Sequence, residues 1–86
     1  MEVIWVTEAV YRDGFQIYIK FNDGTSGIVD LENKLKGPIF EPLKDLVYFK
    51  NFSINAWTIE WPNGADLAPE YLYDLVTQNQ TITQER

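Results

Sequence analysis

The sequence predicts an α+β fold in which a small antiparallel sheet, a three-stranded meander plus a hairpin, packs against short helices. In the first third of the chain, segments with alternating apolar and polar residues are separated by glycine-containing turns. Near the C-terminus, Pro69 precedes apolar residues at helical spacing. The chain of 86 residues has the length of one domain. We place this domain at residues 1–78.

Three segments predict the meander. Residues 3–12 carry apolar side chains on both faces, which is typical of a strand that is covered on both sides. Residues 15–21, FQIYIKF, alternate cleanly, so one face of this strand is expected in the core. Residues 25–31 form the third strand. The turn residues Asp13-Gly14 and the triplet 22–24 join the three strands in order.

Prolines divide the middle of the chain into short pieces. Gly37-Pro38 and Pro42 exclude one long helix. We expect a single turn over 31–36 and a short helix over 43–50. The residues of this helix that are expected to face the sheet are Leu43, Leu46 and Val47, with Phe49 or the stem of Lys50 as further alternatives.

A second hairpin is predicted from the segments 52–54 and 57–61, joined by a turn at 55–56. Large aromatic residues on the inward face of a strand are usually core residues, so we expect Trp57 to be buried. Trp61 lies at the margin of the sheet. Burial and exposure at an interface are about equally expected for it.

The segment WPNGADLAPEYL, residues 61–72, predicts the passage from the last strand into a helix. Pro62 cannot donate a ladder hydrogen bond and therefore ends the strand, and Asn63-Gly64 forms a turn. We expect Asp66 to tie this turn by accepting a backbone N–H near Ala68. The alternative is that Asp66 is available to a lysine or arginine of a partner.

The C-terminal helix is predicted to span about 69–78. Leu67 and Leu72 are placed to form a hydrophobic staple around the helix start, and Glu70 lies in the first turn, where the helix dipole favours an acid. The segment 79–86 is polar and is predicted to be a frayed tail.

The charge of the chain narrows its possible partners. The net charge is −6, and after Lys50 the sole basic residue is Arg86. Nucleic-acid binding depends on lysine and arginine, so we expect none. An acidic surface suits a basic protein, although it is also typical of an ordinary solvated face. The N-terminus lacks the pattern of a signal peptide and no apolar run is long enough to span a membrane, so we expect a cytoplasmic protein.

Absent residue types exclude much enzyme chemistry. The chain has no histidine and no cysteine, which removes the common catalytic triads and the usual zinc sites. No phosphate-binding loop motif is present. We therefore assign no catalytic residue, no cofactor and no metal ligand. Four carboxylates leave a hydrolase with a carboxylate pair or a magnesium ion as a third, weaker hypothesis; they are Asp23, Asp30, Glu60 and Asp66.

An aromatic and acidic patch on the C-terminal helix is the best surface candidate. Tyr71 and Tyr73 flank the apolar stripe of this helix, so at least one of them is expected to face solvent. The candidate interaction surface comprises Trp61, Asp66, Glu70, Tyr71, Tyr73 and Asp74.

Three motifs in order, FNDGTSGIVDL, GPIFEPLKDLVYFKNFSI and TIEWPNGADLAPEYLY, resemble the small bacterial domain-of-unknown-function family 2442. The resemblance extends over about residues 3–73. It implies a compact α+β domain with a small antiparallel sheet, and no established activity, cofactor or catalytic residue. Some members carry a helix-turn-helix segment, which we do not expect here because the chain ends soon after its last motif. Others are encoded beside a small uncharacterised domain, as in toxin–antitoxin pairs.

The leading functional hypothesis is a non-enzymatic domain that binds another protein, or a regulatory one. The alternative is an antitoxin-like partner of a small, basic, co-encoded protein. The sequence leaves the oligomeric state open.

Overall fold

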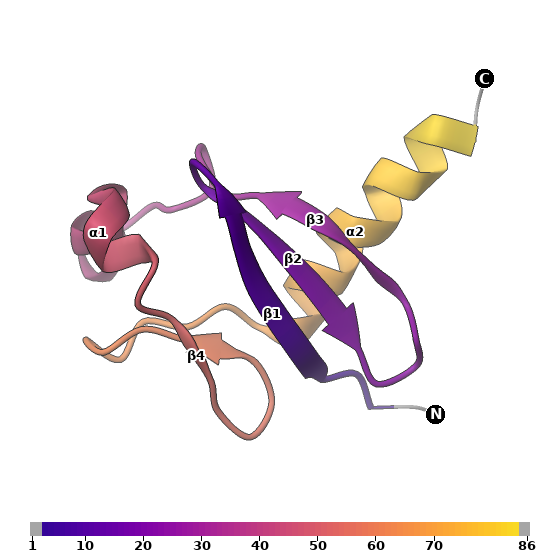
Figure 1. The fold of residues 1–86 in the computed structure, drawn as a ribbon, viewed down its shortest axis with the longest axis horizontal. Coiled ribbons are helices and arrows are strands. Elements are labelled where there is room, and N and C mark those ends of the chain that lie inside the picture. The colour runs from indigo at the N-terminus through magenta and orange to yellow at the C-terminus, as the bar shows by residue number, and fades with distance from the viewer. Residues whose placement is uncertain (1–2, 85–86) are drawn as a thin grey trace.

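The computed structural model describes the backbone of residues 3–84 and the side chains of residues 3–78. It confirms the predicted α+β fold (Figure 1). The meander is an antiparallel sheet in the order β1-β2-β3. Its strands are β1 (Val6–Asp13), β2 (Gln16–Phe21) and β3 (Ser26–Asp30).

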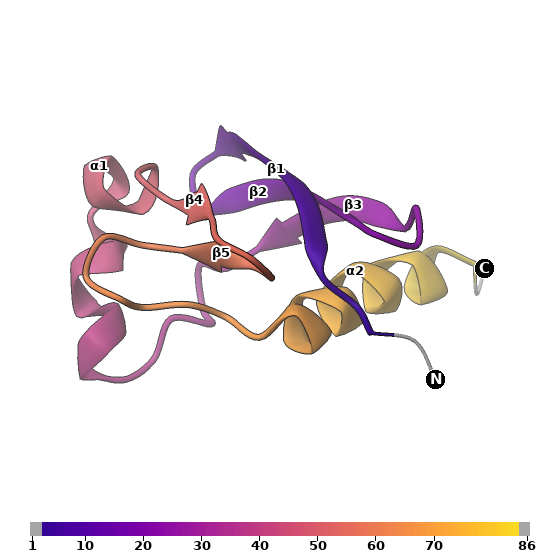
Figure 2. The same cartoon turned by 90° about the horizontal axis from the view of Figure 1, so that it is seen from below.

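The other elements lie below the sheet and at one end of it (Figure 2). The long helix α2 runs beneath the sheet, while a 3-10 helix, η1, and a short helix, α1, lead from β3 to the second hairpin. Their bounds are η1 (Pro38–Lys44), α1 (Leu46–Phe49), β4 (Ser53–Ile54), β5 (Ile59–Glu60) and α2 (Pro69–Gln84).

A β-bulge near the start of β1 decides which residues of this strand face the core. Val6 pairs with Phe21 and Glu8 pairs with Lys20, so β1 has one extra residue between these two pairs. This extra residue, Thr7, shifts the alternation of the side chains. As a result Val6 is buried, and Ala9 and Tyr11 pack on the same core.

The bulge also turns the other face of β1 to solvent. Val10 is 46% exposed, and Val3 lies before the strand and is exposed as well. The prediction that both faces of this strand are covered is therefore wrong. The first turn also differs slightly, because only Gly14 has a positive φ, of 55°, and Asp13 still belongs to β1.

The inner face of the sheet packs against α2, whose Leu72 and Val76 are buried. Gly27 of β3 allows this close approach, since a Cβ atom at Gly27 would lie 2.9 Å from Cγ1 of Val76. The buried core consists of Val6, Ile17, Ile19, Phe21, Val29, Leu31, Leu35, Leu43, Phe49, Ile59, Trp61, Ala65, Leu67, Leu72 and Val76.

The predicted helix over 43–50 is interrupted. Asp45 adopts an extended conformation with ψ of 120° between η1 and α1. Its carboxylate then accepts the backbone N–H of Val47 at 3.0 Å, so Asp45 is the N-cap of a new, shorter helix.

This interruption changes which residues face the core. Leu43 is buried as predicted, and of the two further alternatives Phe49 is buried, whereas Leu46 and Val47 are exposed. A continuous helix would keep Leu43, Leu46 and Val47 on one face. The break at Asp45 resets that phase, and the predicted orientation of Leu46 and Val47 is wrong.

Trp61 belongs to the core and not to the predicted interaction surface. It is 2% exposed, and its indole Nε1–H donates to the backbone carbonyl of Phe49 at 2.8 Å. Its ring lies 5.7 Å from the ring of Phe49 and 6.3 Å from that of Phe52. Phe49 also makes edge contacts with Tyr11 and Phe15. Trp61 thus joins β5 to α1 and to the end of the meander.

The second hairpin forms, but Trp57 is not buried as predicted. The chain connects β4 to β5 through residues 55–58, and Asn55 Oδ1 accepts the N–H groups of Trp57 and Thr58 at 2.9 and 3.0 Å. This local turn leaves Trp57 55% exposed and buries Thr58 instead. The Thr58 hydroxyl is satisfied there, since it donates to the carbonyl of Leu67 at 2.7 Å.

Asn63, rather than Asp66, ties the corner before α2. Its Oδ1 accepts the N–H of Ala65 at 3.0 Å, and its Nδ2 donates to the carbonyl of Ile39 at 2.8 Å. Asp66 forms a backbone bridge with Glu60. Among the described residues, no donor is bonded to the Asp66 carboxylate. The prediction that Asp66 anchors the turn is therefore wrong.

The helix α2 begins at Pro69 as predicted. Leu67 and Leu72 are both buried around its first turn, in agreement with a hydrophobic staple. The helix continues past its predicted end at Gln78. The predicted tail, 79–86, is therefore helical up to residue 84, and its last two residues lie outside the described chain.

Tyr73 ties α2 to the turn between β2 and β3. Its hydroxyl donates to Asp23 Oδ2 at 2.7 Å and lies 3.3 Å from the hydroxyl of Thr25. The ring of Tyr73 meets Phe21 edge-on at 5.0 Å. The Tyr73 hydroxyl, followed by the backbone N–H of Thr25, lowers the pKa of Asp23 below its ordinary value of 3.8.

We expect Trp61→Phe to lower the free energy of unfolding by about 1–3 kcal/mol, because the buried carbonyl of Phe49 loses its donor. Urea denaturation monitored by circular dichroism measures the change. Trp57→Phe is the matched control and should stay within about 0.5 kcal/mol of wild type. Equal effects of the two substitutions would contradict the structural role of the indole hydrogen bond.

We expect Asn63→Ala to destabilise the protein by about 1–2 kcal/mol, since it removes both side-chain hydrogen bonds of the corner. Asp66→Ala removes no hydrogen bond to a described residue and should change stability by less than about 0.5 kcal/mol. Chemical denaturation of both variants checks the assignment. A larger loss of stability for Asp66→Ala than for Asn63→Ala would show that Asp66 anchors the turn.

We expect Tyr73→Phe to lower the melting temperature at neutral pH, and less so in acid. Because the folded pKa of Asp23 is depressed, its contribution to stability is present above the unfolded value of 3.8 and is lost as the pH falls through the lower folded pKa. The melting temperatures of the variant and the wild type should therefore converge as the pH is lowered from neutral to below 3.8. Tyr71→Phe removes an exposed hydroxyl and should show no such convergence.

Candidate functional site

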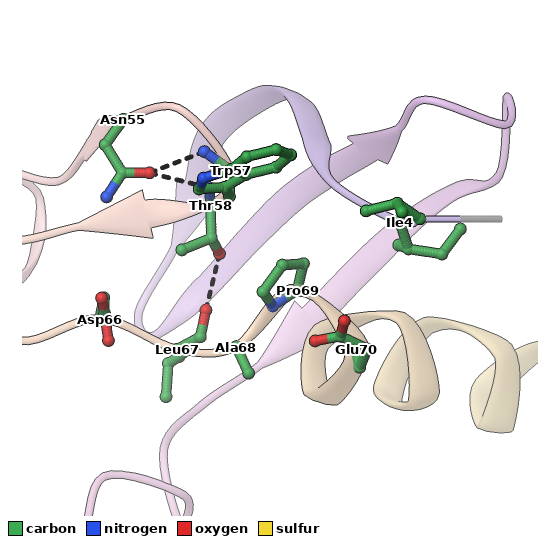
Figure 3. A pocket seen from close by; sticks show the side chains of 10 residues that line it. Ile4, Asn55, Trp57, Thr58, Asp66, Leu67, Ala68, Pro69 and Glu70 are labelled. Carbon is green, nitrogen blue, oxygen red and sulfur yellow. Dashed lines mark hydrogen bonds between the residues drawn. The ribbon is translucent and has the colours of Figure 1, made fainter.

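A groove of about 500 Å³ lies between the β4–β5 connection and the start of α2 (Figure 3). We call it the Trp57 groove. Three segments that are far apart in the sequence meet there: the residues before β1, the connection itself, and the corner before α2. The lining residues are Val3, Ile4, Asn55, Trp57, Thr58, Asp66, Leu67, Ala68, Pro69 and Glu70.

Trp57 forms one wall of the groove and is held in place although its side chain is exposed. The side chain of Asn55 accepts the backbone N–H of Trp57. The backbone carbonyl of Trp57 accepts the N–H of Val6 at 2.8 Å. Its ring meets the ring of Trp5 edge-on, with centroids 6.1 Å apart and an angle of 82° between the planes. The backbone of Trp57 is therefore held by two hydrogen bonds and its ring by one edge contact without any ligand, and such preorganisation lowers the entropic cost of binding.

The apolar part of the groove is also fixed by hydrogen bonds. Thr58 bonds the carbonyl of Leu67 and so sets the distance between the connection and the corner. The side chain of Asn22 donates to the carbonyl of Val3 and accepts the N–H of Trp5, both at 2.9 Å. The N-terminal segment is thereby held against the groove by the turn that follows β2.

The groove carries two negative charges, on the exposed side chains of Asp66 and Glu70. None of its described lining residues is a lysine or an arginine. Neither carboxylate forms an ion pair with a residue of the described chain. The nearby N-terminus of α2 adds a partial positive charge of about half a unit. Two full negative charges outweigh it, so the groove is acidic overall.

This combination of groups suits a cation. The face of a tryptophan attracts an ammonium or guanidinium group, by about 0.5–1 kcal/mol at an exposed site. Carboxylates add charge-assisted hydrogen bonds to the same group. The volume of about 500 Å³ is large enough for more than a single side chain.

The structure separates the residues of the predicted interaction surface. Asp66 and Glu70 line the groove, whereas Tyr71 and Asp74 are exposed farther along α2. Tyr73 lies on a different side of the helix, against Phe21 and Asp23, and Trp61 is in the core.

The prediction missed Trp57, the main aromatic residue of the groove. A signal was present in the sequence, because an asparagine two residues earlier, Asn55, favours a local turn that accepts the N–H of Trp57. The alternation of residues 57–61 predicts burial of Trp57 instead, and the turn overrides it.

The carboxylates considered for catalysis already have partners or lie apart. Asp23 bonds Tyr73, Asp30 accepts the N–H of Glu32, and Glu60 accepts the side-chain amide of Asn55. Within residues 3–78, whose side chains are described, no three acidic side chains form a group that could hold a metal ion. In the described part of the chain, no helix is both long and apolar enough to cross a membrane.

Comparisons with known proteins give the family of the chain. No curated protein and no solved structure gives a significant match. The model of a family described as a protein of unknown function, DUF2442, matches residues 6–78, from the first residue of β1 into α2. This match confirms the resemblance seen in the three sequence motifs. The chain therefore belongs to the DUF2442 family.

Proposed function

We propose that this protein is an interaction module whose Trp57 groove binds an extended, basic segment of another protein. The observation that carries the proposal is a fixed tryptophan, 55% exposed, beside two carboxylates that have no ion-pair partner in the described chain. Tryptophan is among the residues that most often dominate the binding energy at protein interfaces.

The acidic surface extends beyond the groove, which favours a polypeptide over a small molecule. Glu70 and Asp74 are four residues apart on α2, and Tyr71 and Asp74 are three apart, so these side chains are neighbours on the helix surface. A segment bound to Trp57 would pass along this acidic and aromatic strip. Apolar side chains of the same segment would contact Ile4 and Leu67.

An antitoxin-like role is a narrower form of the same proposal. The partner would then be a small, basic, co-encoded toxin, as the acidic composition after Lys50 favours. This form adds a separate expectation: co-expression of the chain should relieve growth inhibition by the co-encoded protein, and Trp57→Ala should abolish the relief.

The proposal is tested by NMR titration of the labelled protein with a short capped peptide in which arginine alternates with leucine. We expect chemical-shift changes at the Trp57 indole and at the backbone of Asp66 and Glu70. Trp57→Ala should weaken binding about tenfold or more. Asp66→Asn and Glu70→Gln should each weaken it severalfold and reduce its dependence on salt.

Matched controls separate recognition from general charge attraction. The same peptide with glutamine in place of arginine should bind more weakly by at least about tenfold. Glu32→Gln removes the same charge from an exposed site outside the groove and should leave the affinity unchanged. Equal losses for Glu32→Gln and Glu70→Gln, or unperturbed Trp57 resonances at saturation, would refute the proposal.

A further inference from the structure

The corner before α2 contains the one Asn–Gly step of the sequence, Asn63–Gly64. Asn–Gly steps are the most reactive sites of spontaneous asparagine deamidation, because glycine has no Cβ atom to shield its backbone nitrogen. Both residues are exposed, so water reaches the step. The chemistry for a covalent modification is therefore present in the chain, and the fold decides whether it proceeds.

Deamidation is a cyclisation followed by a hydrolysis. The backbone nitrogen of Gly64 gives up its proton and attacks Cγ of Asn63. A bond forms between these two atoms, and the bond from Cγ to Nδ2 breaks. Nδ2 takes up the proton and leaves as ammonia. Water then adds to either carbonyl of the succinimide ring and opens it, so that aspartate or isoaspartate stands at position 63.

The corner restrains both nitrogen atoms that take part. The N–H of Gly64 donates to the carbonyl of Trp61 at 2.9 Å, so the attacking nitrogen is already hydrogen-bonded. The side-chain amide of Asn63 is held from two directions: Nδ2 donates to the carbonyl of Ile39 at 2.8 Å, and Oδ1 accepts the N–H of Ala65 at 3.0 Å. Cyclisation consumes the Gly64 N–H and the Nδ2 group, so both of their hydrogen bonds are lost.

Buried neighbours maintain this geometry. Trp61 and Ala65, on either side of the step, are 2% and 1% exposed, and the N–H of Trp61 donates to the carbonyl of Ala65 at 2.8 Å. The turn between them closes through Gly64, whose φ is 91°. The amide of Asn63 cannot approach the Gly64 nitrogen freely unless these contacts open. We propose that Asn63 is a site of spontaneous deamidation that the native corner protects and that reacts when the corner opens.

The modification works in one direction, because its products do not fit the corner. Aspartate at position 63 has no N–H for the carbonyl of Ile39 and brings a carboxylate close to it. Isoaspartate puts a Cβ atom into the main chain, which lengthens the turn between Trp61 and Ala65 and disturbs their hydrogen bond. Opening permits the reaction, and the reaction then favours opening. This inference does not depend on ligand binding in the Trp57 groove.

Peptide mass spectrometry of the full chain, incubated at neutral pH in buffer and in guanidinium chloride, tests the proposal. Deamidation replaces an NH2 group by OH, and the mass gain of fragments locates it. We expect Asn63 to be the first asparagine to react in the unfolded chain, and to react at least about tenfold more slowly in the native protein. A capped peptide of residues 60–67 in the same two solvents corrects for the effect of the denaturant on the reaction.

Three variants separate the fold from the chemistry. Gly64→Ala places a Cβ atom beside the attacking nitrogen and should slow the reaction severalfold in the unfolded chain. Trp61→Phe keeps the Asn–Gly step but weakens the corner, so it should speed the reaction in buffer. Val47→Ala, at an exposed position of α1, should leave the rate unchanged. Circular dichroism confirms folding, and Phe52→Leu, which removes a ring contact of Trp61, replaces Trp61→Phe if that variant is unfolded.

The deamidated protein, separated by ion exchange and refolded, should unfold at a lower denaturant concentration than the unmodified protein. Equal rates in the native and unfolded chains overturn the proposal, as does another asparagine that reacts first in denaturant. A Gly64→Ala chain as reactive as wild type overturns it as well. The same holds for a weakened corner that reacts no faster than Val47→Ala, and for a deamidated protein as stable as the unmodified one.

Discussion

The hydrogen bond from the Trp61 indole to the carbonyl of Phe49 is the constraint on which the second half of the structure depends. A buried carbonyl without a donor is costly, and a buried indole N–H needs an acceptor. Each group satisfies the other here, in a cluster of aromatic rings that joins α1, β5 and the end of the meander. The position of Trp61 in turn fixes where the chain leaves β5. The corner tied by Asn63, the start of α2 at Pro69 and the Trp57 groove follow from that exit point.

The regular parts of the fold could be predicted because local chemistry and tertiary packing agree there. Alternation in 15–21 and glycine in the turns predicted the meander, and Pro69 with Leu67 and Leu72 predicted the start of α2. The errors arose where a single residue changes the phase of a pattern. Thr7 adds a residue to β1, and Asp45 ends one helix and caps the next. No periodicity in the sequence reports such a shift, because it depends on the register that the neighbouring element imposes.

Of the Trp57 groove, the sequence predicted the acidic residues but not the tryptophan. Asp66 and Glu70 were identified as acids near the helix start, but Trp57 was assigned to the core by extending the alternation of 57–61. The structure instead buries Thr58, since the carbonyl of Leu67 satisfies its hydroxyl. A polar residue can take a core position whenever such an acceptor is present, and the acceptor lies nine residues away in the chain. Sequence alone does not show that pairing, so it does not show which side chain is displaced to the surface.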